Sequence, residues 1–503
     1  MADIKTLKPF INGAFVESKT KNYSDAFNPS TGEVIARVPA CTAEEVDLAI
    51  EAAARAFPAW AATPVLKRVE ILYRLRAMLT EEMDDLTYLV AWENGKAWEE
   101  AKGDVLKARE ATEHAIAAPE LLMGESIMQA TPGFDSVMYR EPVGVYIGIV
   151  PFNFPAMIPM GWMAPMCVAC GNTMVIKASS ATPQSALRVA EMYKKAGLPD
   201  GVLNVITCTR NEVNHCIVHK DVKGISFVGS TNTGLHIYSA AAAAGKRVQA
   251  LCEAKNHALV MDDAPIERTA AGIINSAYGC AGERCMALPV VVAHEAIADD
   301  LVAALAEQAK NLKIGPSYDR ETGLGPVVSK AHRDSIVKWI EKGIEEGGKP
   351  VLDGRNCVVP GFENGFYLGP TILDHIKPGM TVGDEEIFGP VLCIKRVKDF
   401  EEGLALMNQN PFANGSVIFT QNGYYAREFA HRTHGGMVGI NVGIPVPVGM
   451  FPFSGHKNSF FGDLHCLGKD GVRFYTETKV VTSRWFDEAE SKRRKVSTWD
   501  GTI

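Results

Sequence analysis

The stretch NTMVIKASSATPQSALRVAEMYKKAGLPDGVLNVIT, residues 172–207, decides the fold class. It begins with a short apolar run rich in β-branched residues, NTMVIKAS, and it ends with another, GVLNVIT. Between them PQSALRVAEMYKKAG carries apolar residues at helical spacing and ends in Gly197, a residue type common just after a helix. A strand, a helix and a second strand in this order predict a parallel α/β sheet.

The same alternation continues along the chain in two series. The first series continues with KGISFVGS and TGLHIYSAAAAAG. The second series consists of ALVMDDAP, LPVVVAHE, IADDLVAALAEQAKNL, DSIVKWIEKGIEEGG and GPVLCIKRV. We expect the two series to meet near residues 245–260. Before them, residues 40–125 read as helices with Thr42 as an N-cap, and 135–155 turns β-rich. The stretch GVRFYTETKVVTSRW, 471–485, predicts a β-arm.

Composition narrows the function classes. The 503-residue chain has a formal net charge of −8, so no global basic field favours nucleic acid or anionic membranes. Its one basic cluster, residues 492–495, lies in a polar tail and is typical of a solvated end. No apolar run reaches the roughly 18 residues of a membrane span, and no signal pattern opens the chain. The 11 scattered cysteines favour a reducing compartment, so we expect a cytoplasmic protein, or a mitochondrial matrix protein after processing.

The segment GCAGERCMALP, residues 279–289, holds the most informative cysteine, Cys285. A metal site would need further ligands at matched spacing, and no second pair accompanies Cys280 and Cys285, so no metal is expected. Cys167 and Cys170 lie in an apolar, helix-like run typical of packing. A glycine-containing polar loop and the adjacent Arg284 would favour a thiolate nucleophile, but buried free cysteines are common. The residues alone leave both interpretations open.

Two other stretches carry possible chemistry. In IVPFNFP, Asn153 stands between two aromatic residues. Its amide could donate a hydrogen bond to an oxyanion, or it could form hydrogen bonds with the backbone groups of a buried turn. In FVGSTNTG a strand runs into a Gly-Ser-Thr turn before a helix, where a phosphate finds free N–H groups. The spacing differs from G-x-G-x-x-G, so a plain strand–helix turn remains an alternative.

Taken in order, six short motifs resemble the aldehyde dehydrogenase superfamily over nearly the whole chain: PFNFP, VIKAS, ISFVGST, ERC, EEIFGP and FPFSG. Within the superfamily, PFNFPAMIPM, AKNHALVMDDA, GERCMAL and the KDGVRFYTETKVVTSRW end are similar to the CoA-acylating branch that oxidises methylmalonate and malonate semialdehydes. The resemblance implies an α/β fold in three parts. These are a Rossmann-type NAD(P)-binding domain (1–125 and 146–250), an α/β catalytic domain (251–465) and a β oligomerisation arm (126–145 and 466–503). It also implies a homo-oligomer, for which we favour a tetramer over a dimer.

The resemblance assigns roles residue by residue. Cys285 would add to the aldehyde, and Asn153 with the Cys285 backbone N–H would form the oxyanion hole. Arg284 and Lys107 would hold the carboxylate of a small acidic aldehyde. CoA would be the co-substrate, giving acetyl-CoA or propionyl-CoA after decarboxylation. NAD or NADP would be contacted by Phe152, Lys177, Ser180, Ser230, Glu386 and Phe388.

One departure from the superfamily bears on the reaction. Hydrolytic members carry ELGGK, whose glutamate activates water, whereas this chain has LCEAK at 251–255 with Leu251 in that place. A leucine cannot take a proton. Hydrolysis of a Cys285 thioester should therefore be slow, and a thiol such as that of CoA should accept the acyl group faster than water does.

Three further departures concern specificity. Lys107 stands where the branch has a second arginine. Lysine keeps the positive charge but cannot form the two parallel hydrogen bonds that a planar guanidinium makes to a carboxylate. Ser180, in KASS, replaces the glutamate of NAD-preferring relatives and predicts that NADP is accepted. Glu253 stands where the branch usually has glycine; it would be a surface acid, a helix-cap partner or a substitute base, and a structural role is favoured.

Two other functions compete with the acylating one. A hydrolytic NADP-dependent dehydrogenase of another small anionic aldehyde would need a base such as Glu253. A non-catalytic relative would have no reason to keep Cys285, Asn153 and Glu386 together.

Overall fold

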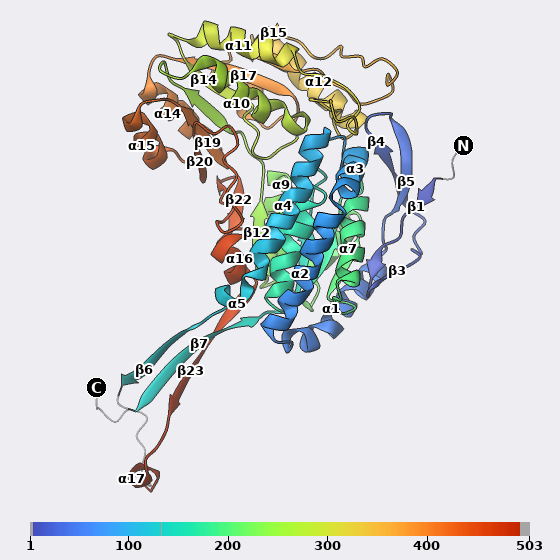
Figure 1. The fold of residues 1–503 in the computed structure, drawn as a ribbon, viewed down its shortest axis with the longest axis vertical. Coiled ribbons are helices and arrows are strands. Elements are labelled where there is room, and N and C mark those ends of the chain that lie inside the picture. Colours follow the sequence, from blue (N-terminus) through green and yellow to red (C-terminus); the bar gives the residue numbers. More distant parts are fainter. Residues whose placement is uncertain (1–3, 132, 493–503) are drawn as a thin grey trace.

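Two large sheets organise the computed structural model, which describes residues 4–131 and 133–492 (Figure 1). The first sheet has eight strands. Its five central strands, from β12 to β10 in the spatial order given below, are parallel to one another. The predicted unit at 172–207 is confirmed as a strand, a helix, α7 (Gln184–Lys195), and a parallel strand, with Gly197 at φ +98°. In spatial order the strands are β22 (Phe460–Gly462), β12 (Arg247–Leu251), β11 (Val222–Val228), β8 (Val145–Ile149), β9 (Thr173–Lys177), β10 (Leu203–Ile206), β2 (Phe10–Ile11) and β3 (Ala14–Phe15).

Alternating side chains bury both faces of this sheet. Ile147, Val175 and Ile225 pack into one core cluster with α1 (Ala43–Ala61), while Tyr146 and Met174 point into another on the opposite face. Residues two apart on a strand share a face, which explains the division. The predicted N-cap Thr42 is confirmed, because it forms a capping box with Glu45 at the start of α1. The remaining helices of this half are α2 (Val65–Glu81), α3 (Met83–Asn94), α4 (Trp98–Ile116), α5 (Ala118–Leu121), η1 (Ile158–Met163), α6 (Ala164–Ala169), α8 (Arg210–Val218) and α9 (Thr231–Ala243).

The second sheet is seven-stranded, has its own core and is parallel except at its edge strand β15. Its order is β15 (Lys349–Leu352), β16 (Thr371–Asp374), β17 (Val391–Val397), β14 (Val290–His294), β13 (His257–Val260), β19 (Gly415–Phe419) and β20 (Met437–Ile440). Its helices are α10 (Ile266–Tyr278), η2 (Gly279–Gly282), α11 (Ala298–Lys310), α12 (Lys330–Glu345), α13 (Thr381–Asp384), α14 (Phe400–Gln409) and α15 (Gly423–Arg432).

The chain passes from the first sheet to the second between Leu251 and His257, inside the expected interval 245–260. It returns once, because β22 pairs with β12 in the first sheet. Residues 460–462, which we assigned to the predicted catalytic domain, therefore lie in the sheet of the other part. The division into three domains otherwise remains a prediction.

A three-stranded arm extends away from both sheets (Figure 1). It consists of β6 (Glu125–Thr131), β7 (Phe134–Pro142) and β23 (Thr476–Arg484). The expected strand at 471–485 needs one correction: its first residues belong to helix α16 (Gly468–Phe474). This turn is helical because its apolar side chains pack into the first core and the Phe474 carbonyl accepts a hydrogen bond from the Tyr146 hydroxyl, 2.7 Å away.

Small elements complete the chain: β1 (Lys5–Thr6), β4 (Tyr23–Asn28) and β5 (Glu33–Pro39) form one sheet, β18 (Phe412–Ala413) and β21 (His456–Lys457) another, and α17 (Glu488–Ser491) follows the arm. Of the basic cluster at 492–495, only Lys492 lies within the described residues. Within the described ranges, no helix has both the length and the apolar character to cross a membrane.

Candidate active site

Cys285 follows a tightly constrained loop. Helix α10 ends at Tyr278, and Cys280, Ala281 and Gly282 then take φ of +53°, +52° and +75°. Left-handed backbone costs free energy for residues other than glycine and persists only where the surroundings enforce it. At Gly282 a Cβ would lie 2.1 Å from the Gly389 carbonyl oxygen, so only glycine fits. The loop before the candidate nucleophile is therefore held in a single path.

The backbone of Cys285 itself is fixed by two buried asparagines. The Asn256 Nδ2 donates to the Cys285 carbonyl at 2.8 Å and to that of Ala287 at 2.8 Å, while its Oδ1 accepts from the Gly415 N–H at 2.8 Å. Asn414 Nδ2 donates to the same Cys285 carbonyl at 3.1 Å. The cysteine is thus attached to both β13 and β19 of the second sheet.

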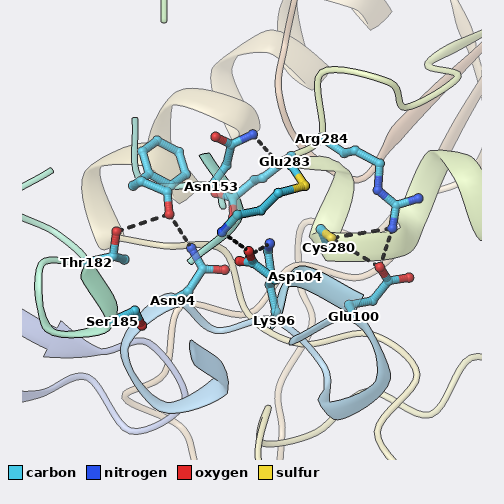
Figure 2. Close-up of polar contacts among 12 residues, drawn as sticks. Asn94, Lys96, Glu100, Asp104, Asn153, Thr182, Ser185, Cys280, Glu283 and Arg284 are labelled. Carbon is cyan, nitrogen blue, oxygen red and sulfur yellow. Dashed lines mark hydrogen bonds and ion pairs between the residues drawn. The ribbon is translucent and has the colours of Figure 1, made fainter. Parts of the chain in front are cut away.

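Asn153 approaches this loop from the other sheet. It lies just after β8, its side chain is buried, and its Nδ2 donates to the Glu283 carbonyl at 3.2 Å (Figure 2). The preceding carbonyl, of Phe152, accepts from Asn94 at 2.9 Å and from Thr182 at 3.1 Å. An amide nitrogen has two hydrogens, so one remains for a further acceptor. The two predicted oxyanion-hole residues are brought together.

Arg284, next to Cys285 in the chain, is already paired with a carboxylate. Its Nη2 forms an ion pair with Glu100 Oε2 and contacts the Cys280 sulfur at 3.4 Å (Figure 2). Burial raises the pKa of the Cys285 thiol to about 12; Glu386 raises it further and Arg284 only partly offsets this. Arg284 therefore favours the thiolate, as expected, but burial has the larger effect on the pKa of Cys285.

Arg284 keeps one donor nitrogen free. Its side chain is 8% exposed, and its Nη1 is buried without a hydrogen-bond partner among the described residues. A buried guanidinium nitrogen without an acceptor is costly. A ligand carboxylate would relieve that cost.

A cavity of about 340 Å³ joins the predicted substrate residues to the nucleophile. Cys285, Arg284 and Lys107 all line it, together with apolar side chains that include Phe154 and Trp162. Lys107, from α4, is already paired with Glu110 at 2.6 Å. Each cation of the cavity thus has a carboxylate beside it, so the lining attracts an anion less strongly than two unpaired cations would.

The predicted nicotinamide-side residues meet on the far side of Cys285. Phe152 and Phe388 pack edge to face with centroids 5.9 Å apart, and His332 contacts both rings. Glu386 and Phe388 share a small cleft with Cys285. Burial raises the pKa of Glu386 to about 8, although its Oε1 accepts from the Ala254 N–H at 3.1 Å, which lowers that pKa.

The predicted adenosine-side residues lie at the carboxyl ends of parallel strands, where dinucleotides bind in such folds. Lys177 ends β9, and its side-chain Nζ makes no hydrogen bond or ion pair within the described part of the chain, which leaves a cation for a ribose hydroxyl or phosphate. Ser180 is exposed nearby in the sequence, and Ser230 is the N-cap residue of α9. Together these groups fit a dinucleotide: Lys177 and Ser180 for its adenosine end, the start of α9 for its phosphates.

Leu251 and Glu253 differ sharply in their surroundings. Leu251 is 4% exposed and packs into the first core, so the position of the hydrolytic base is filled by hydrocarbon. Glu253 Oε2 accepts a hydrogen bond from the Thr231 N–H at 3.0 Å, at the start of α9. Of the alternatives for Glu253, the helix-cap partner is confirmed.

Sequence reasoning missed several residues of this region, chiefly Glu100, Asn256, Asn414 and His332. Glu100 precedes Lys107 by seven positions on α4, and that spacing places both side chains on one helix face. This periodicity was a usable signal. The asparagines and His332 act through contacts between distant segments, which no local pattern indicates. In the described ranges no group of three or more His, Cys, Asp or Glu residues is arranged to hold a metal ion.

Comparison with known proteins agrees with this geometry. The model of the aldehyde dehydrogenase family matches residues 15–481. The chain belongs to the aldehyde dehydrogenase family. It is 49% identical to malonate-semialdehyde dehydrogenase 2 of Geobacillus kaustophilus, covering 96% of this chain and 99% of that protein. It is also 48% identical to malonate-semialdehyde dehydrogenase 1 of Geobacillus thermodenitrificans, over 96% and 99% of the two chains.

Solved structures of this family superpose closely. The methylmalonate-semialdehyde dehydrogenase of Oceanimonas doudoroffii has a TM-score of 0.95 at 42% identity, covering 97% of this chain and 99% of that chain. A candidate methylmalonate-semialdehyde dehydrogenase of Sinorhizobium meliloti 1021, complexed with NAD, has a TM-score of 0.95 at 40% identity with the same coverage. The predicted aldehyde dehydrogenase fold is confirmed.

Alkylation kinetics test the protonation state of Cys285. Because burial raises the pKa of this thiol to about 12, the reactive thiolate is scarce at neutral pH. The rate of iodoacetamide labelling, followed by peptide mapping, should rise about tenfold per pH unit from about pH 7 to about pH 10 in the cofactor-free protein. Cys285→Ser should lose the labelled peptide. A plateau below about pH 9 would contradict the assignment.

A substitution in the cavity tests the role of Lys107. Lys107→Arg would restore a planar two-point donor, so the KM for malonate semialdehyde should fall about fivefold with kcat little changed. Lys102→Arg, on the same helix but outside the cavity lining, is the matched control. An unchanged KM in Lys107→Arg would rule out contact between this side chain and the substrate.

Proposed function

We propose that the protein is an NAD(P)-dependent, CoA-acylating dehydrogenase of malonate semialdehyde and methylmalonate semialdehyde. The observation that carries the proposal is a combination of two features: Arg284, which lines the cavity with Cys285, has a buried nitrogen without a partner among the described residues, and Leu251 stands in place of a hydrolytic base. The names of the relatives described above point to the same substrates.

The first step is addition of the Cys285 sulfur to the aldehyde carbon. The thiol gives up its proton to solvent, the sulfur forms a bond to the carbonyl carbon, and the π electron pair moves to the carbonyl oxygen, which becomes an alkoxide. Asn153 has one amide hydrogen beyond its bond to Glu283, and the Cys285 backbone N–H is a second donor. Arg284 Nη1 would hold the substrate carboxylate and so orient the aldehyde toward the sulfur.

Hydride transfer then converts the adduct to a thioester on Cys285. Bound NAD or NADP supplies the hydride acceptor. Lys177, Ser180 and Ser230 would hold its adenosine and phosphate end, while Glu386, Phe152 and Phe388 would position the nicotinamide end. Exposed Ser180 carries no charge to repel a 2′-phosphate, so NADP should be accepted alongside NAD.

The thioester is released by a thiol rather than by water. No side chain at Leu251 can remove a proton from water, whereas the CoA thiol is the stronger nucleophile. The substrate carboxylate leaves as CO₂, because the electron pair that it releases is stabilised on the carbon next to the thioester carbonyl, and that carbon then takes up a proton from solvent. The products are acetyl-CoA from malonate semialdehyde and propionyl-CoA from methylmalonate semialdehyde.

The hydrolytic alternative has less support. It needs a base near Cys285, and the Glu253 carboxylate is engaged with the Thr231 N–H. A non-catalytic role would leave the shared cavity of Cys285 and Arg284 without a purpose.

We also propose that the protein is a homo-oligomer, with a tetramer favoured, and that it acts in the cytoplasm. The arm exposes large apolar side chains, including Met128 at 84% and Val480 at 65% exposure, which is typical of surfaces that pair with another chain. All 11 cysteines are free thiols, as in a reducing compartment. The net charge of −8 gives no reason to expect nucleic acid or membrane partners.

Product analysis tests the proposed reaction. Purified protein with malonate semialdehyde, NAD and CoA should form acetyl-CoA, CO₂ and reduced cofactor in equal amounts, and methylmalonate semialdehyde should give propionyl-CoA. Cys285→Ala should form none of these. Accumulation of malonate in place of acetyl-CoA would show hydrolysis and refute the acylating assignment.

A further inference from the structure

The start of helix α9 is already occupied by a side chain of the protein itself. Glu253 follows β12, and its Oε2 accepts the Thr231 N–H, the first helical residue of α9, at 3.0 Å. The helix supplies no acid of its own there: its first turn has no acidic residue, and the Ser230 hydroxyl donates to Thr233 instead of capping a backbone N–H. Glu253 is therefore the anion at this helix terminus, where the dipole favours negative charge.

That position coincides with the place proposed for the cofactor phosphates. α9 begins at the carboxyl end of β11, beside β12 in the first sheet. A phosphate and a carboxylate cannot accept the same N–H together, and like charges at short range repel. A bound dinucleotide would have to displace the Glu253 side chain or tolerate its charge nearby.

The side chain of Glu253 can move while its backbone stays fixed. Its carbonyl accepts the Ser459 hydroxyl at 2.6 Å, and the next N–H, of Ala254, donates to Glu386 at 3.1 Å. The side chain is partly exposed, and the bond to Thr231 is the only hydrogen bond of its carboxylate among the described residues. Release of the carboxylate from α9 therefore requires rotation of side-chain bonds alone.

We propose that Glu253 is an internal competitor for the cofactor phosphates, which weakens binding of NAD and NADP by occupying the start of α9. The proposal rests on the dinucleotide site of the proposed function and deepens it. It assigns a role in cofactor affinity to a residue outside the set expected to contact the cofactor. The competition acts on every ligand that carries a pyrophosphate, whatever its nicotinamide or ribose end.

Equilibrium binding tests the competition without any aldehyde. The dissociation constants of NAD, NADP and ADP are measured by calorimetry for wild type and for Glu253→Gln, which keeps the size and a hydrogen-bond acceptor but removes the charge. We expect all three to bind Glu253→Gln about tenfold more tightly at low salt. The difference should shrink toward unity at high salt, because screening weakens repulsion between charges near the surface. Adenosine, which has no phosphate, should bind both proteins equally.

The matched control is Glu402→Gln. Glu402 lies in the first turn of α14, in the half of the protein built on the second sheet, and likewise accepts a backbone N–H, from Lys398 at 2.8 Å, so the substitution removes the same charge near another helix start. It should bind all ligands like wild type. Thermal unfolding of both variants checks that they are folded, and each should lose only a small amount of stability with its helix-terminal charge.

The outcomes separate the competition from the proposed cofactor site. Equal or weaker binding of NAD, NADP and ADP by Glu253→Gln would overturn the competition while leaving the dinucleotide site intact. A salt-independent gain, or an equal gain for adenosine, would overturn it as well, since neither reports repulsion of phosphates. Absence of binding by every protein would refute the cofactor site and the competition together.

Discussion

The segment from Leu251 to His257 is the constraint on which the rest of the site depends. It joins the two sheets, and its residues contact the start of α9, Glu386 and the backbone of Cys285. Glu253 contacts the start of α9, the Ala254 N–H holds Glu386, and Asn256 holds the Cys285 carbonyl. Lys255, fully buried, donates to the Val382 carbonyl at 2.9 Å. Elements of both sheets are thereby aligned by one short stretch of backbone, whose consecutive residues contact different partners.

Paired charges govern the substrate side of the site. Glu100 balances Arg284, and Glu110 balances Lys107, so the cavity carries cations without a large net positive field. The free Nη1 of Arg284 then becomes the specific point of attraction for an anion. Arg284 also lowers the pKa of the Cys285 thiol, but burial of the thiol and the nearby Glu386 raise that pKa to about 12.

Local patterns in the sequence were sufficient for much of the fold. The unit at 172–207, the Thr42 cap and a passage between sheets within 245–260 follow from periodicity and capping chemistry, which depend on neighbouring residues. The return of β22 to the first sheet and the helical turn α16 depend on contacts with β12 and Tyr146, hundreds of positions away. Such contacts leave no local periodicity.

The site divides in the same way. Cys285, Asn153 and Leu251 could be chosen from short motifs, and the structure brings the first two to one loop while burying the third. Glu100 could have been placed on the Lys107 face of α4, but its ion pair with Arg284 could not be predicted, because the two residues are 184 positions apart and meet only in the fold. The protonation state of Cys285 was missed for the same reason, since desolvation is a property of the assembled interior.

The central claim is that Cys285 forms a thioester which the protein cannot hydrolyse. Rapid mixing of the enzyme with malonate semialdehyde and NAD in the absence of CoA tests it most directly, with intact-mass analysis of the quenched protein. The account predicts a burst of about one reduced cofactor per Cys285, an acyl adduct on that residue, and turnover at least about a hundredfold slower afterwards. Linear formation of reduced cofactor without a burst or an adduct would contradict it.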